Sequence, residues 1–138
     1  MENDVILKKM DSLRRCLTRV EEKIPDDWSI IPNDYDLQDI LTINLERAVQ
    51  LSVDIGLQVL VLLSMKPPDT MADVFSRLSE NGIISSELSV NLRKSVGFRN
   101  IAVHEYEEIN WDIVRSICTD HLRDFYRFIE AILDFSQP

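Results

Sequence analysis

The sequence predicts an all-α protein, an antiparallel bundle of about five helices. Apolar residues recur every three or four positions along most of the chain, and no segment shows the strict alternation of a half-buried strand. The composition, 45% hydrophobic with only 3 glycines in 138 residues, suits an ordered chain with a core of its own. We expect residues 1–138 to form a single domain.

The first helix is predicted over Glu2–Ile24, where apolar residues return at helical spacing and Pro25 ends the pattern. A connector with two prolines follows over Pro25–Tyr35. Asp34 or Asp36 can cap the helix that comes next. The apolar members of the connector are expected to pack on the bundle; they are Trp28, Ile30 and Ile31.

The second helix is the longest pattern and is predicted over Leu37–Met65. Its second half is apolar on nearly every side, which is typical of a central, buried helix. Gly56 in this half is expected to let a neighbouring helix approach closely. The run Lys66-Pro67-Pro68 stops the helix.

Two further helices flank the middle of the chain. A short one is expected to begin after Asp69 or Thr70 and to end at Asn81-Gly82. The last helix is predicted over Trp111–Phe135, with Asn110 as its cap.

The remaining helix leads into the segment Arg99–Tyr106, which concentrates side chains able to bind phosphate or transfer protons. Ser85 or Ser86 is its expected cap, and it runs to about Val103. At about 100° per residue, Arg99 falls within an otherwise mostly apolar stripe. A guanidinium there is either bonded to an acidic residue or to carbonyls as a structural group, or it lies at an interface or a cleft.

The two histidines have different surroundings. His104 follows Arg99 by five residues, which an ideal helix places about 140° away. The two side chains converge only where the helix bends or ends, or where a second subunit supplies the partner. His121 lies on the apolar stripe of the last helix and is expected to be a core or interface histidine.

The net charge of -9 argues against tight, unaided binding to long nucleic acid. A small basic cluster of Arg93, Lys94 and Arg99 still leaves room for a local electropositive cleft. The acidic balance also suits a basic protein partner.

Cysteine usage and hydropathy indicate where the protein works. The two cysteines, Cys16 and Cys118, form no disulfide framework and no metal-ligand spacing, so we expect reduced thiols in a cytoplasmic protein. The start of the chain is acidic, with no apolar signal core behind it, and no apolar run approaches a membrane span. We expect no membrane association.

The segment Arg99-Asn100-Ile101-Ala102-Val103-His104-Glu105-Tyr106 resembles the R-x4-H-x-Y motif of HEPN-domain toxins, specifically the HepT family. The resemblance covers roughly residues 37–132. Three flanking segments also resemble the family and occur in its order: Asn44 to Gln50, Gly82-Ile83-Ile84, and Asn91-Leu92-Arg93-Lys94 running into Gly97.

The resemblance implies a HEPN-like twofold dimer whose interface cleft cuts RNA without a metal or cofactor. In that chemistry the RNA 2′-hydroxyl is the nucleophile, His104 is the general base or acid, and Arg99 stabilises the phosphorane charge. Asn100 is expected to orient, and Arg93 and Lys94 are candidates for RNA contact. The substrate class, transfer or messenger RNA, stays open.

The resemblance also implies a regulator. HepT toxins are paired with an MNT-type nucleotidyltransferase antitoxin that attaches AMP to the motif tyrosine, here Tyr106. An added phosphate beside Arg99 would occupy the site and repel RNA. The plainer interpretation of Tyr106 is an amphipathic aromatic packed at the surface.

Two alternatives stay open at this point. In one, the chain is a non-catalytic module in which Arg99 and Tyr106 hold a nucleotide or the nucleotidyltransferase partner. In the other, it is a purely structural helical dimer. The acidic run Glu105, Glu107 and Glu108 is either solvated or orients the Arg and His.

Overall fold

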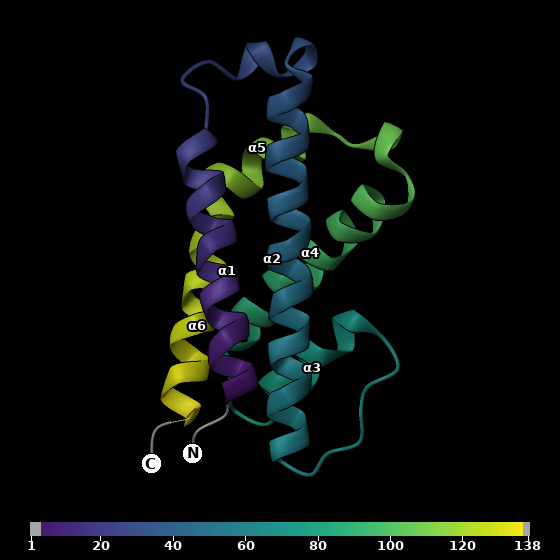
Figure 1. The fold of residues 1–138 in the computed structure, drawn as a ribbon. Coiled ribbons are helices and arrows are strands. Elements are labelled where there is room, and N and C mark those ends of the chain that lie inside the picture. Colours follow the sequence, from purple (N-terminus) through teal and green to yellow (C-terminus); the bar gives the residue numbers. More distant parts are fainter. Residues whose placement is uncertain (1–3, 137–138) are drawn as a thin grey trace.

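The computed structural model describes residues 4–136, and these form an all-helical bundle in which no strand occurs. α1, α2 and α6 run lengthwise beside one another, α4 slants across behind α2, and α3 packs at the lower end of α2 and α4 (Figure 1). The α-helices are α1 (Asp4–Lys23), α2 (Tyr35–Leu62), α3 (Met71–Glu80), α4 (Ser86–His104), α5 (Trp111–Ser116) and α6 (Leu122–Ser136).

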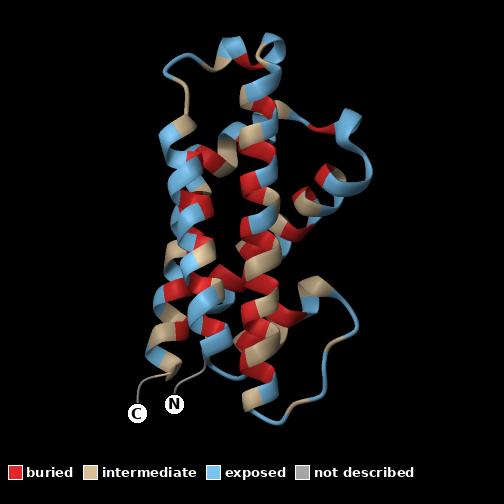
Figure 2. Ribbon diagram, in the orientation of Figure 1, coloured by how far each residue is buried: buried red, intermediate tan, exposed pale blue. Residues whose placement is uncertain are grey.

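The buried residues form one apolar core between these helices (Figure 2). α2 contributes more of it than any other helix, as its nearly all-round apolar pattern predicted. Phe75 and Phe128 meet edge-on in this core, with ring centroids 5.8 Å apart at 83°. Edge-to-face packing is favourable beyond the area it buries.

Gly56 lets α3 approach α2, which confirms the sequence prediction. A Cβ built at Gly56 would lie 2.5 Å from Val74 Cγ1 and 3.1 Å from Leu78 Cδ1. Real Cβ atoms do not approach other heavy atoms so closely, so any larger residue would push the two helices apart.

Four side chains cap the helices, each one of the residues predicted for its helix. Asp34 accepts a hydrogen bond from Leu37 N at 3.0 Å at the start of α2. The other caps act in the same way on their own helices; they are Thr70, Ser85 and Asn110. Such caps satisfy amide groups that a helix start leaves unpaired.

α2 ends earlier than the sequence predicted, at Leu62 rather than Met65. Ser64 adopts a left-handed backbone with φ 57°. The amides of Ser64 and Met65 then bond back to Val61 O and Leu60 O, both at 2.9 Å. This is a Schellman motif, so the helix ends before it reaches Pro67 and Pro68.

The connector only partly packs on the bundle. It contains a 3₁₀ helix, Trp28–Asn33, in which Ile31 is buried and Trp28 is half-buried. Ile30 is 44% exposed, so the expectation that all three apolar residues pack inward is wrong for Ile30. At the other end of the first helix, the predicted start at Glu2 lies outside the described residues.

The last predicted helix is one uninterrupted helical run with a π-helical turn, Ile117–His121, between α5 and α6. α5 is inclined to α6 across this turn (Figure 1). A π turn inserts a wider loop of backbone into an α-helix and allows it to bend. The predicted extent is therefore confirmed, and the sequence did not reveal the π turn that divides the run into α5 and α6.

None of the helices within residues 4–136 is long and apolar enough to span a membrane.

Candidate functional site

Arg99 projects from α4 with its guanidinium only partly paired. Nη1 donates a hydrogen bond to Asn100 Oδ1 at 3.2 Å, while Nε is buried and has no hydrogen-bond partner among the described residues. No carboxylate within residues 4–136 forms a salt bridge with Arg99. A structural Arg bonded to an acidic residue is therefore not what residues 4–136 show. A structural Arg bonded to carbonyls, an interface and a cleft stay open, since the bond to Asn100 is to a side-chain carbonyl.

His104 is the last residue of α4 and is exposed. Glu105 closes the helix behind it, with its amide donating to Ile101 O at 2.8 Å and its φ at -141°. The His104 ring makes no hydrogen bond or ion pair with any residue that the structure describes, Arg99 included. That the two side chains diverge within one chain stays a prediction from the helical spacing.

Tyr106 turns back from the end of α4 onto α2. It begins a short 3₁₀ helix, Tyr106–Glu108, and its hydroxyl donates a hydrogen bond to Asp39 Oδ1 at 2.7 Å. Burial, and then this bond, raise the pKa of Tyr106 to about 12. The side chain is nevertheless 39% exposed, so it can be reached from solvent.

Asp39 and Thr42 are neighbours of Tyr106 that the sequence did not reveal. Asp39 lies 67 residues before Tyr106, and Thr42 follows one turn further along α2. Thr42 Oγ1 is buried, lies close to the phenol, and makes no hydrogen bond within the described chain. No local pattern links these residues to the motif, because only the packing of α4 and its exit on α2 brings them together.

The acidic side chains that follow α4 form no ion pair within residues 4–136. Glu105, Glu107 and Glu108 are all exposed, and none forms an ion pair among residues 4–136. Of the two interpretations of this run, the structure favours solvated side chains over groups that orient Arg99 and His104.

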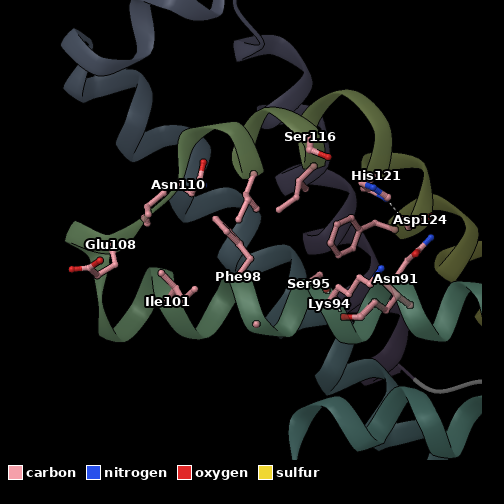
Figure 3. A pocket seen from close by; sticks show the side chains of 16 residues that line it. Asn91, Lys94, Ser95, Phe98, Ile101, Glu108, Asn110, Ser116, His121 and Asp124 are labelled. Carbon is pink, nitrogen blue, oxygen red and sulfur yellow. Dashed lines mark hydrogen bonds and ion pairs between the residues drawn. The ribbon is translucent and has the colours of Figure 1, made fainter.

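A cavity of about 480 Å³ lies on the other side of α4, between that helix and the α5–α6 run (Figure 3). Lys94 lines it, whereas Arg99, His104 and Tyr106 do not. Its wall is mainly apolar and includes Phe98. The two candidate RNA-contact residues therefore differ in position. Both are exposed, but Lys94 lines this cavity and Arg93 does not.

His121 lines the same cavity and is not a core residue. Its Nδ1 lies 2.8 Å from Asp124 Oδ2, and its side chain is 43% exposed while that of Asp124 is 5% exposed. The expectation that His121 is a core histidine is therefore wrong. The expectation that it lies at an interface stays a prediction. The π turn places His121 at this edge, where Figure 3 shows it beside Asp124.

No group of three or more His, Cys, Asp or Glu side chains within residues 4–136 is arranged to hold a metal ion. A family model described as ribonuclease HepT-like matches residues 11–132, which includes this motif.

The chain belongs to the HepT-like family.

Among relatives of this HepT-like protein is one from Shewanella oneidensis named mRNA nuclease HepT. The two are 38% identical over 130 residues, which is 94% of this chain and 97% of the relative. The family resemblance and the helical fold expected from the sequence are thereby confirmed.

Two solved structures share the fold closely. One, described as tri-AMPylated S. oneidensis HEPN toxin in complex with MNT antitoxin, has a TM-score of 0.89 and 38% identity over 96% of this chain and 99% of its own. The other is described as a toxin–antitoxin with AMP-PNP, with a TM-score of 0.90 and 37% identity over the same shares of the two chains.

Proposed function

We propose that this HepT-like protein is the toxin of a toxin–antitoxin pair, an endoribonuclease that cuts RNA without a metal. The whole chain acts as one HEPN-like domain in the cytoplasm. The observation that carries the proposal is Arg99, whose buried Nε has no partner, followed at the helix end by an exposed and unbonded His104. A family described as ribonucleases, and a relative named an mRNA nuclease, support the same function.

The proposed reaction uses the nucleophile that RNA already carries. His104 takes the proton of the 2′-hydroxyl, or gives one to the leaving 5′-oxygen, as an imidazole near neutral pH can do. Arg99 binds two oxygens of the phosphorane through its planar guanidinium, which no carboxylate within residues 4–136 occupies. Asn100, already bonded to Nη1, orients that guanidinium.

The proposed active unit is a twofold homodimer. One chain supplies a single motif histidine, which the helical spacing places about 140° from Arg99, whereas acid and base catalysis together need two proton-transfer groups. Two copies facing each other across a cleft would supply both histidines and both arginines.

The proposed regulator is an MNT-type nucleotidyltransferase antitoxin that attaches AMP to Tyr106. Tyr106 is partly exposed and lies two residues after His104, so an added phosphate would stand at the mouth of the RNA site. The solved relative described as a tri-AMPylated toxin in complex with an MNT antitoxin supports this regulation.

The proposal is tested by cleavage of messenger RNA in excess EDTA, with transfer RNA as the second substrate. Wild type and His104→Ala are compared after intact mass shows that neither carries a nucleotide on Tyr106. We expect cleavage by wild type alone, with 2′,3′-cyclic phosphate ends, while the variant keeps its fold and its dimer. Equal cleavage by the variant contradicts the role of His104, and cleavage that EDTA abolishes contradicts metal independence.

The second candidate is a non-catalytic module that binds the nucleotidyltransferase or a nucleotide. The net charge of -9 favours it, because RNA binders usually carry positive charge. An unmodified, dimeric wild type that cuts no cellular RNA, yet binds the nucleotidyltransferase, would establish this module in place of the ribonuclease.

A further inference from the structure

The hydroxyl of Tyr106 lies against α2, where Asp39 and Thr42 are its neighbours. Asp39 Oδ1 accepts its proton in a hydrogen bond of 2.7 Å. Thr42 is close enough to lower the pKa of Tyr106, although its buried Oγ1 makes no hydrogen bond within residues 4–136. The phenol oxygen is thus held with a proton acceptor and a potential hydrogen-bond donor on the same helix.

This arrangement matches what a tyrosine needs in order to attack phosphorus. A neutral phenol is a weak nucleophile, and the pKa of about 12 keeps Tyr106 neutral at physiological pH. The proton must therefore leave as the new bond forms, and 2.7 Å is within the range for direct transfer to a base. The exposed edge of the ring leaves room for a nucleotide to approach.

We propose that Asp39 is the proton acceptor, and Thr42 the hydrogen-bond donor, for nucleotidyl transfer to Tyr106; the inference rests on the modification proposed above. Tyr106 Oη attacks the α-phosphorus of a nucleoside triphosphate, and the bond from that phosphorus to the leaving pyrophosphate breaks. The Oη proton passes to Asp39 Oδ1. The products are a tyrosyl-AMP phosphodiester, pyrophosphate and a protonated Asp39, which returns its proton to water.

A second tyrosine supplies the matched control. Tyr126 on α6 donates to a Glu21 oxygen on α1, with Thr18 beside it, and its pKa is also raised to about 12. This pair ties two helices together outside the motif. A tyrosine–carboxylate bond by itself is therefore not evidence of reactivity, and the experiment must separate the two pairs.

The test uses adenosine 5′-phosphorimidazolide, an activated AMP donor that needs no partner enzyme. Peptide mass mapping gives the rate of adenylylation at Tyr106 and at Tyr126 in wild type, Asp39→Asn and Glu21→Gln. We expect Asp39→Asn to slow Tyr106 by at least about 10-fold, since positioned bases contribute about 10²–10⁴-fold. Glu21→Gln should leave Tyr106 unchanged, and Thr42→Val should slow it by a smaller factor.

The pH profile separates proton transfer from a merely structural role. With Asp39 present, the rate at Tyr106 should be nearly flat from pH 7 to 9. In Asp39→Asn it should rise about tenfold per pH unit, because hydroxide must then remove the proton. Circular dichroism verifies that the variants are folded, which is expected because Asp39 is exposed.

Three results would overturn the inference: an Asp39→Asn rate equal to or faster than wild type, the same pH profile in both, or no adenylylation of Tyr106 in wild type. A separate arm with ATP and the S. oneidensis MNT antitoxin tests the proposed regulation itself. If that arm leaves Tyr106 unmodified while the imidazolide arm behaves as expected, the regulation fails and the role of Asp39 stands.

Discussion

Arg99 has a guanidinium whose hydrogen-bonding groups are only partly satisfied. Its Nη1 is bonded to Asn100, its Nε is buried without a partner, and none of the described carboxylates neutralises it. A buried donor without an acceptor costs about 1–3 kcal/mol, and more on a charged group. The arrangement around Arg99 therefore costs stability, and the proposed role in binding phosphate gives a reason for that cost.

Replacing Arg99 with Lys should separate charge from geometry. Lys keeps the positive charge but cannot bind two phosphate oxygens through one planar group. We expect single-turnover RNA cleavage to slow by about 100-fold, a typical cost of losing one transition-state donor. The control is Arg123→Lys, an exposed position on α6, which should cleave at the wild-type rate.

Local sequence was enough to find the residues of the motif, and not enough to find what surrounds them. Arg99, His104 and Tyr106 stand within eight positions, so their spacing could be compared with a known motif. Asp39 is 67 residues away from Tyr106, and its place depends on how α4 ends and packs on α2. His121 follows the helical period of its stripe, but the π turn beneath it and its pairing with Asp124 leave its side chain half exposed.

The packing of α2 on α3 depends on a single small residue. Gly56 faces Val74 and Leu78, and an added methyl group there would overlap Val74 and crowd Leu78. We expect Gly56→Ala to lower the free energy of unfolding by about 1–3 kcal/mol, the usual cost of overpacking a core. Urea denaturation followed by circular dichroism measures the change.

Gly97 is the matched control for this element. It also lies inside a helix, but a Cβ there would meet nothing within 4 Å. Gly97→Ala should therefore be neutral or stabilise the fold by about 0.5–1 kcal/mol, because alanine loses less backbone entropy than glycine. A Gly56→Ala variant as stable as Gly97→Ala would contradict the close approach of α3.

The extents of the helices could be predicted because caps and prolines are local signals. Asp34, Thr70, Ser85 and Asn110 each bond an amide two or three residues ahead, so they announce a helix start within one turn of sequence. The end of α2 and the division between α5 and α6 were not predicted, because no characteristic residue type marks either backbone conformation. Ser64 adopts a left-handed conformation more typical of glycine, and the π turn keeps the apolar period of the helix it interrupts.

For the whole molecule, the sign of the net charge says more about partners than about the fold. The chain carries -9, and the exposed run at the end of α4 adds carboxylates beside the proposed RNA site. Long RNA is then repelled at a distance, and binding depends on the few cations of α4. An acidic surface of this kind is compatible with low affinity of the free protein for long RNA. It is also compatible with the proposed antitoxin covering the site.

Titration of buried groups gives the whole fold a dependence on alkaline pH. Burial raises the pKa of Cys118 from 9.0 to about 12, and burial with the Glu21 bond raises the pKa of Tyr126 from 10.0 to about 12. The unfolded chain therefore loses these protons first, at lower pH than the folded chain. Their contribution to stability is complete below about pH 9 and is lost progressively toward pH 12.

We expect the free energy of unfolding to fall between pH 9 and 11, by about 1 kcal/mol per pH unit for each group that titrates late. Urea denaturation at pH 8, 10 and 11 gives the slope. Cys118→Ala lowers stability at every pH by leaving a cavity. The comparison with wild type therefore uses the slope of the unfolding free energy against pH, and not its absolute value. Because the thiol is gone, the variant should lose stability less steeply above pH 9. An identical slope would mean that Cys118 loses its proton at the same pH in the folded and unfolded chain, and that its burial does not protect it.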